Sequence, residues 1–151
     1  MSLRAVAYVS QAVDGIKETD IDRILQDATE HNRLAGVTGV LVFDGHRFLQ
    51  YLEGPDDGVG SVYPRVLNAR SHHHVRELAS GEVPVRQFPR WKVASARIGT
   101  EVMSDIADVP WDGFIAHPPV EGHRRTGFAR LLEVWTGTSG ELEPTALSLG
   151  S

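Results

Sequence analysis

The chain has 151 residues, of which 41% are hydrophobic, a size and composition typical of one globular domain with a short appendage. Its formal net charge of −5 at pH 7 argues against a phosphate-neutralising surface and therefore against nucleic acid as a partner. Because there is no cysteine, the sequence excludes disulfides, thiolate nucleophiles and thiolate metal sites, and it favours a reducing compartment.

The first predicted element is a mostly buried strand over residues 3–9, a short β-prone run. No long apolar stretch follows the early charge of Arg4, so this segment does not resemble a signal peptide. No window approaches the roughly 18 apolar residues that cross a bilayer. We therefore expect a cytoplasmic protein with no membrane association.

A helix is predicted after the loop at residues 11–17. Its apolar side chains fall at helical spacing: Ile21, Ile24, Leu25 and Ala28. Thr19 or Asp20 is the expected N-cap, and Gly36 is the expected stop just past the end. A β-hairpin should follow, with strands over 37–43 and 46–52 and a turn at Asp44-Gly45.

A second helix is predicted over residues 59–67, where a helical stripe returns. Pro64 lies inside it and removes one backbone hydrogen bond, so we expect a kink or a late helix start. Strands over 75–83 and 91–98 follow. The order predicts an α+β, ferredoxin-like βαββαββ sheet of four or five strands with two helices on one face.

The last third of the chain should cover the opposite face of the sheet. Helices are expected over 101–109 and 124–135, and the second carries a compact apolar stripe: Phe128, Leu131, Leu132 and Trp135. We expect a main domain over residues 1–98, a C-terminal helical cap over 99–136 and a flexible tail over 137–151.

The sequence contains no recognisable catalytic motif. No nucleophile elbow organises its serines and histidines, and no Gly-rich phosphate loop opens a helix. His72-His73-His74 invites a metal interpretation. Adjacent residues of a regular element do not all face one ion, and no carboxylate lies at a useful spacing. We therefore predict neither a metal site nor an enzyme.

Three polar residues, Tyr8, Asn32 and Gln50, occur within or beside apolar segments. Gln50 lies deep in a predicted hairpin strand, where an amide without hydrogen-bond partners costs about 1–3 kcal/mol. Taken singly, each has a structural explanation: a core tyrosine with its hydroxyl at the rim, a helix-end asparagine and a solvated edge amide.

Together these residues belong to motifs that resemble those of the BLUF family, the sensors of blue light using FAD, in its short single-domain form. The motifs are Tyr8-Val9-Ser10, His31-Asn32-x-x-x-Gly36-Val37-Thr38-Gly39-Val40-Leu41, Phe48-Leu49-Gln50-Tyr51-Leu52-Glu53-Gly54-Pro55 and Phe88-Pro89-Arg90-Trp91. Their order and spacing agree with the family pattern over about residues 3–96.

The resemblance implies that residues 1–98 bind a flavin non-covalently between the two helices. The photoactive residues would be Tyr8, Gln50 and Trp91. The cofactor-binding residues would be Tyr8, Ile24, His31, Asn32, Gln50, Arg70 and His72. The slot would be lined by residues drawn from Ile21, Ile24, Leu25, Val62, Val66 and Leu67. FAD is the expected flavin, with FMN and riboflavin as alternatives.

Two positions depart from the family pattern. Ser71 stands where the family has an arginine, for which Arg70 would substitute, and Val93 replaces the usual methionine. The implied mechanism begins when Tyr8 donates an electron and then a proton after blue light excites the flavin. Gln50 then rotates or tautomerises, and the changed hydrogen bonds are signalled to a separate partner protein.

The resemblance also implies a homo-oligomer that signals through Trp91 and the helix over 124–135. Two other functions stay open. One is a non-photoactive interaction module with the same fold. The other is a small enzyme of the acylphosphatase type, which needs an arginine after the first strand. Residues 11–17 contain none.

Overall fold

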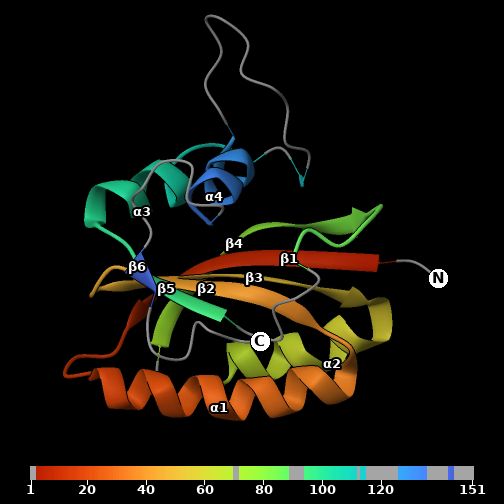
Figure 1. Cartoon of the computed structure of the whole chain (residues 1–151), viewed down its shortest axis with the longest axis horizontal. Helices are drawn as coiled ribbons and strands as arrows, with labels where there is room; N and C mark the ends of the chain where they lie inside the picture. Colours follow the sequence, from red (N-terminus) through yellow and green to blue (C-terminus); the bar gives the residue numbers. More distant parts are fainter. Residues whose placement is uncertain are drawn as a thin grey trace, which may run out of the picture.

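The computed structural model of the chain describes residues 3–69, 72–88, 94–111, 113–114, 126–135 and 143–144. Within these residues the backbone forms one mixed sheet with helices on both faces (Figure 1). The strands are β1 (Leu3–Ala12), β2 (Thr38–Phe43), β3 (Arg47–Pro55), β4 (His72–Val83), β5 (Ala94–Arg97) and β6 (Glu143–Pro144). The helices are α1 (Glu18–Ala35), α2 (Asp56–Leu67), α3 (Thr100–Ala107) and α4 (Gly127–Trp135).

The strand order across the sheet is β4-β1-β3-β2-β5-β6. Paired strands are antiparallel, except that β2 and β5 are parallel. Helices α1 and α2 lie on one face, and α3 and α4 lie on the other (Figure 1). The predicted ferredoxin-like α+β fold is therefore confirmed, and the described part of the chain adds the short strand β6 to the expected sheet.

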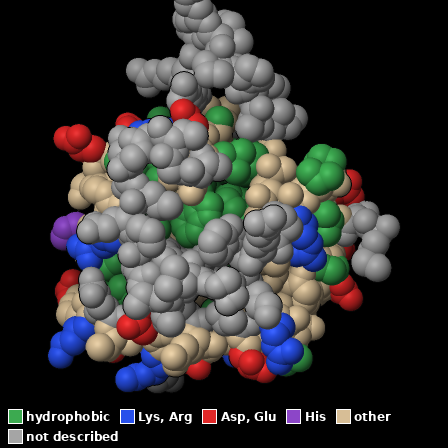
Figure 2. Space-filling view, in the orientation of Figure 1, with side chains coloured by type: hydrophobic (Ala, Val, Ile, Leu, Met, Phe, Trp, Pro, Cys, Tyr) green, Lys and Arg blue, Asp and Glu red, His purple; other side chains and the backbone are tan. Residues whose placement is uncertain are grey.

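Alternate side chains of β3 face the two helical layers, as the two-residue period of a strand requires. Leu49 and Tyr51 belong to the large buried cluster that includes Phe128 of α4. Phe48 and Leu52 belong to smaller clusters with residues of α1 and α2. The sheet therefore packs against one large apolar cluster on the face of α3 and α4 and against two smaller ones on the face of α1 and α2. In the view of Figure 2, hydrophobic side chains gather near the centre and charged ones lie around the rim.

Helix α1 begins earlier than predicted and ends where predicted. Its N-cap is Lys17, so the expectation of Thr19 or Asp20 at this position was wrong. Asp20 instead acts from inside the first turn, where its carboxylate accepts a hydrogen bond from the Lys17 backbone N–H at 2.9 Å. At the other end, Gly36 adopts a left-handed φ of 73° that favours glycine, which confirms the predicted stop.

Helix α2 begins at Asp56 and continues through Pro64, so the expectation of a late start was wrong. The reason is a close helix–helix contact rather than a local signal. A Cβ at Gly58 would lie 2.2 Å from the carbonyl oxygen of Ala35, so only glycine lets the first turn of α2 pack against the end of α1.

No helix in the described ranges is long and apolar enough to cross a membrane.

The hairpin between β2 and β3 turns at Asp44 and Gly45, as predicted. Oδ1 of Asp44 accepts backbone hydrogen bonds from His46 at 2.8 Å and from Arg47 at 2.7 Å. Gly45 has a φ of 101°, in the left-handed region. The turn therefore fixes the position of Arg47 at the start of β3.

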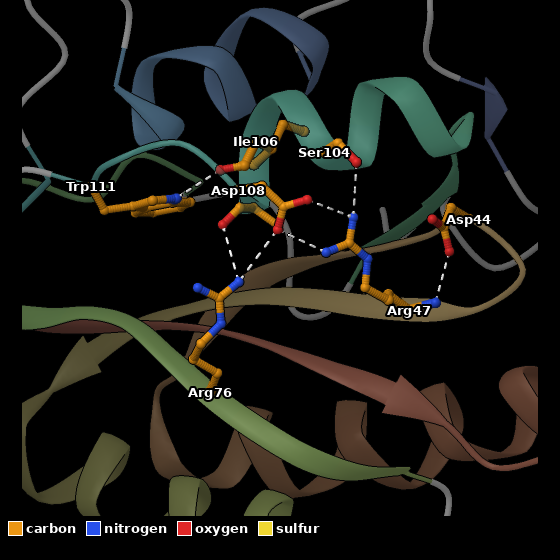
Figure 3. Close-up of polar contacts among 8 residues, drawn as sticks. Asp44, Arg47, Arg76, Ser104, Ile106, Asp108 and Trp111 are labelled. Carbon is orange, nitrogen blue, oxygen red and sulfur yellow. Dashed lines mark hydrogen bonds and ion pairs between the residues drawn. The ribbon is translucent and has the colours of Figure 1, made fainter.

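Arg47 ties the sheet to the end of α3 (Figure 3). Its guanidinium donates hydrogen bonds to the Asp108 carboxylate at 3.0 and 3.2 Å and to the Ser104 hydroxyl at 3.1 Å. Arg76 of β4 reaches the same carboxylate at 3.4 Å. We call Arg47, Arg76 and Asp108 the α3 clamp, because they join this helix to two strands.

Candidate functional site

A cavity of about 330 Å³ lies between α1, α2 and the sheet, within the size range of ligand-binding pockets. Its walls are mostly apolar: Ile24, Ala28, Leu41, Phe48, Val62 and Val66. Its polar lining comes from Tyr8, His31, Asn32, Gln50 and His72. Asp27, Arg65 and Ala69, all exposed, complete the lining. A flat, largely apolar ligand with polar edges fits this combination.

The structure brings together six of the residues that were predicted to bind the cofactor or to be photoactive. They come from four elements and line this one cavity: Tyr8, Ile24, His31, Asn32, Gln50 and His72. Two further predicted residues, Arg70 and Trp91, lie outside the described residues, as do the two departures from the family pattern, Ser71 and Val93.

The six apolar candidates for the slot divide into lining and core. Ile24, Val62 and Val66 line the cavity. Ile21 belongs instead to a buried cluster, and Leu67 is 44% exposed and does not line the cavity. The side chain of Leu25 is outside what the structure describes.

Several lining residues were missed, although the period of their elements could have found them. On α1, Asp27 and Ala28 lie three and four positions after Ile24, and on α2 Arg65 stands in the same relation to Val62. On the sheet, Phe48 shares a face with Gln50 because they are two residues apart. Leu41 pairs with Gln50 across β2 and β3, whereas Ala69 lies beyond the end of α2, where the helical period gives no signal.

Tyr8 and Gln50 are directly opposite each other on β1 and β3. Both are buried, and the Tyr8 hydroxyl donates a hydrogen bond to Oε1 of Gln50 at 2.5 Å. Burial raises the pKa of the Tyr8 phenol far above its ordinary value, with a smaller contribution from Tyr63. The phenol is therefore protonated and acts as the donor. The carbonyl oxygen of Gln50 accepts this bond, and its amide nitrogen remains as a donor for a ligand.

Asn32 supplies the clearest sign of a missing ligand. Its side chain is 2% exposed, and its Nδ2 atom has no hydrogen-bond partner among the described residues. A buried donor without an acceptor costs about 1–3 kcal/mol. A ligand with carbonyl acceptors along one edge, such as the ring of a flavin, would satisfy it. The donor set of the cavity thus fits the cofactor that the sequence predicts.

His72 joins three elements at the wall of the cavity. Its Nε2 lies 2.7 Å from the carbonyl oxygen of Val66, and its Nδ1 lies 2.6 Å from the hydroxyl of Ser10. Since a carbonyl only accepts, Nε2 of His72 carries a proton and donates it in a hydrogen bond to Val66. His73 and His74 are exposed, so the three histidines do not share a site. No metal-binding group of three or more ligand residues occurs in the described part of the chain.

Comparison with known proteins agrees with this site. Residues 3–94 match the family model described as sensors of blue light using FAD, BLUF. Over 96 residues, 63% of this chain, the sequence is 31% identical to photoactivated adenylate cyclase subunit beta of Euglena gracilis, of which the match covers 11%. Over 86 residues, 57% of this chain, it is 31% identical to the blue light- and temperature-regulated antirepressor BluF of Escherichia coli strain K12, of which the match covers 21%. The chain thus spans a small part of these relatives.

Solved structures show the same likeness. The photo-activated state of BlsA superposes with a TM-score of 0.62 at 25% identity, covering 70% of this chain and 76% of that one. A bacterial light-regulated adenylyl cyclase gives a TM-score of 0.60 at 25% identity, covering 68% of this chain and 30% of the cyclase. The dark state of BlrB, a BLUF protein, shares the fold with a TM-score of 0.62 at 21% identity, over 71% of this chain and 80% of that one. The chain belongs to the BLUF family, the flavin-binding sensors of blue light.

Proposed function

We propose that this chain is a blue-light receptor that binds FAD non-covalently in the cavity between α1 and α2, with Tyr8 and Gln50 as its photoactive pair. The observation that carries the proposal is the Tyr8–Gln50 hydrogen bond at the wall of an apolar cavity. The unpartnered amide nitrogen of Asn32, in the same cavity, supports it.

Each side chain of the cavity has a role in holding the flavin. The apolar walls, among them Ile24 and Val62, pack against the faces of the ring. Asn32 and His31 bind its polar edge. Arg65, which lines the cavity and is exposed, supplies a positive charge for the phosphates of FAD. The family resemblance implies that Arg70 also binds this end of the cofactor, and that role stays a prediction.

The photochemistry depends on the hydrogen bond between the two opposite strands. When bound, the flavin supplies the absorption of blue light and accepts an electron. Tyr8 gives up an electron and then its hydroxyl proton, which moves toward Oε1 of Gln50. Gln50 rotates or tautomerises as the electron and the proton return to Tyr8, and its amide then presents a different donor or acceptor to the cavity. Trp91 stays a further photoactive candidate from the family resemblance.

BLUF domains are sensor modules, and the proposed chain has no enzymatic activity of its own. Residues 1–98 form the flavin-binding domain, and residues 99–136 form the cap through which the signal leaves. Helices α3 and α4 support this role because they pack on the sheet face opposite the cavity. We propose a cytoplasmic homo-oligomer that signals to a separate partner protein, with residues 137–151 as a tail.

Cofactor occupancy tests the first half of the proposal. The purified full-length chain should absorb blue light with a flavin spectrum, and the flavin released by denaturation should be FAD rather than FMN or riboflavin on chromatography. Flavin-free protein should recover the same spectrum on incubation with FAD. A colourless protein that takes up no added flavin of any of the three kinds would show that the chain is not a receptor.

A further inference from the structure

A second tyrosine lies next to Tyr8. Tyr63 of α2 has its ring centroid 6.2 Å from that of Tyr8, with the planes inclined at 37°. Its charge also contributes to the raised pKa of Tyr8, so the two phenols are close enough to interact electrostatically. Rings in contact at this separation are near enough for an electron to pass between them.

Tyr63 also has a base of its own. The Tyr63 side chain interacts with the carboxylate of Glu77, and burial together with this carboxylate raises the pKa of Tyr63 to about 12. Glu77 belongs to the edge strand β4 and is exposed. A proton received by Glu77 therefore has direct access to solvent.

A strand irregularity places Glu77 on the same face as Tyr8. The register shifts between Ala7 and Tyr8, so that Ala7 pairs with Ala79 but Tyr8 pairs with Glu77. Leu78 is left between these pairs and packs against the opposite core. A bulge of this kind redirects side chains across the sheet. It brings a carboxylate opposite the photoactive tyrosine, where regular pairing would have brought Leu78.

The two phenols differ in what their protons meet. Tyr8 is buried, and its hydroxyl bonds the amide oxygen of Gln50. Tyr63 is half-buried, and it interacts with a carboxylate that is in contact with water. A phenol that loses an electron becomes a strong acid, and a carboxylate is a much better proton acceptor than an amide oxygen. Oxidation is therefore more favourable at Tyr63 than at Tyr8.

We propose that Tyr63 is a second redox-active tyrosine that reduces oxidised Tyr8, with Glu77 as its proton acceptor. The proposal rests on the proposed function, in which the light-excited flavin is the oxidant that takes one electron from Tyr8. Tyr63 then passes one electron to the oxidised Tyr8 ring while its hydroxyl proton moves to the Glu77 carboxylate. The products are the Tyr8 phenol, a neutral Tyr63 radical and protonated Glu77, which releases the proton to water.

This step competes with the rearrangement of Gln50. Once Tyr8 is a phenol again, its proton no longer has to move to Gln50, and that light-absorption event gives no shifted state. The electron returns later from the reduced flavin to Tyr63, which regains its proton from solvent through Glu77. Tyr63 and Glu77 thereby lower the yield of the signalling state per photon.

The composition of the chain makes the radical traceable. There are three tyrosines in the sequence: Tyr8, Tyr51 and Tyr63. Tyr51 is the matched control for Tyr63, because it too is paired with a carboxylate. Its hydroxyl donates a hydrogen bond to Glu53 at 2.9 Å. It lies on the other face of β3, in the core beneath α3 and α4. This pair differs from Tyr63 and Glu77 in its position relative to Tyr8 and in its burial, since Tyr51 and Glu53 are both fully buried.

The test compares the flavin-loaded full-length wild type with Tyr63→Phe, Glu77→Gln and Tyr51→Phe. Samples are frozen under blue light for electron paramagnetic resonance, and the yield of the red-shifted form is measured in solution. The tyrosyl radical signal should be present in the wild type and in Tyr51→Phe and lost in Tyr63→Phe. Glu77→Gln should reduce it. The yield of the red-shifted form should rise in Tyr63→Phe and Glu77→Gln.

A flavin-free measurement checks the pair independently. With ¹³C at the tyrosine Cζ position, the apoprotein should give three resonances, and Glu77→Gln should move the one that Tyr63→Phe removes. An unmoved resonance would show that Tyr63 and Glu77 do not interact and would overturn the proposal. It is also overturned if Tyr63→Phe keeps the wild-type radical and yield while the light-induced shift is normal, a result that leaves the receptor function intact. Absence of the light-induced red shift in the flavin-loaded wild type would contradict both the proposed receptor function and the redox role of Tyr63.

Discussion

Asn32 is the residue whose environment depends most directly on the cofactor, because its buried amide nitrogen has no partner within the described protein. We predict that Asn32→Leu has effects of opposite sign in two measurements. In the flavin-free protein it removes an unsatisfied donor, so the free energy of unfolding in urea should rise by about 1 kcal/mol. The affinity for FAD, measured by fluorescence titration, should fall by about tenfold or more, because the variant lacks a donor for the ring.

If Asn32→Leu raised both the free energy of unfolding and the affinity for FAD, or lowered both, the result would contradict this interpretation. If stability falls and affinity is unchanged, the amide has a structural role that the orphaned nitrogen does not reveal. Asn68, an exposed residue at the end of α2, offers the control. Asn68→Leu should leave FAD affinity close to the wild-type value.

Glu53 shows how a buried charge can hold a segment of backbone. It is fully buried, and its two oxygens accept hydrogen bonds from the Tyr51 hydroxyl at 2.9 Å and from the backbone N–H groups of Gln87 at 2.9 Å and Phe88 at 2.6 Å. In Glu53→Gln, an NH2 group replaces one of these oxygens. That NH2 group is a donor and would face the hydrogen-bond donors that the oxygen now accepts from. We predict a loss of about 1–3 kcal/mol in the free energy of unfolding.

Hydrogen exchange should locate the effect of Glu53→Gln. The amides of Gln87 and Phe88 should exchange faster than in the wild type, whereas those of β1 should change only through the global loss of stability. Unchanged exchange at Gln87 and Phe88 would mean that the carboxylate does not fix this segment. The matched variant is Glu82→Gln, since Glu82 is an exposed residue of β4.

At the scale of elements, the α3 clamp makes the attachment of α3 dependent on pH. The hydrogen bonds from Arg47 hold the pKa of Asp108 below its usual range. A lowered pKa in the folded state means that the contribution to stability is present above the unfolded pKa, about 3.9, and is lost as the pH falls through the folded value. Because Asp108 is about half exposed, we expect less than about 1 kcal/mol.

Urea unfolding of wild type and Asp108→Asn tests the clamp. The wild type should be more stable at pH 7, and the difference should vanish at low pH and shrink in high salt. Asp14→Asn removes the same charge from an exposed loop and should change stability little. A difference between wild type and Asp108→Asn that persists at low pH would exclude the ion pairs as its cause.

The elements that were predicted well are those with local signals. Gly36 ends α1 and Asp44-Gly45 turns the hairpin, because each needs a backbone conformation that few residues adopt. The start of α2 was missed because it depends on Gly58 packing against Ala35, two positions far apart in the sequence. The low helix propensity of Pro64 disfavours a helix here, but the tertiary contact of Gly58 outweighs it.

The part of the candidate site that could be predicted from the sequence is the part marked by family motifs or by the periodicity of helices and strands. Tyr8, Asn32 and Gln50 came from motif spacing, and period alone would have added Phe48 and Arg65. The network of His72 with Ser10 and Val66 could not be predicted, because it joins three elements through side-chain geometry. The Tyr63–Glu77 pair depends on a strand bulge that leaves no mark in the sequence pattern.

On the scale of the whole molecule, the sheet separates the proposed flavin cavity from helices α3 and α4, which belong to the proposed cap. On β3, Gln50 lines the cavity while the next residue, Tyr51, belongs to the core beneath α3 and α4. A rearrangement at Gln50 therefore needs to cross only the thickness of one strand to reach the cap. We predict that the cap is not required for the photochemistry, so Asp108→Asn should keep the normal light-induced shift.

Cofactor binding should stabilise the whole molecule. A ligand that binds only the folded state adds about 2.7 kcal/mol at a free concentration 100 times its Kd. The melting temperature of the apoprotein should therefore rise with added FAD, and the rise should be smaller for Asn32→Leu. A melting temperature that does not respond to FAD would contradict a cavity formed for this cofactor.

The proposed photochemistry depends on a light-driven change in the hydrogen bond between Tyr8 and Gln50. The most direct measurement is the light-minus-dark absorption spectrum of the flavin-loaded wild type, Tyr8→Phe and Gln50→Leu. The wild type should show a small reversible red shift of the flavin band, and both variants should bind flavin but lose the shift. A normal shift in both variants would contradict the assignment of this pair as the photoactive centre.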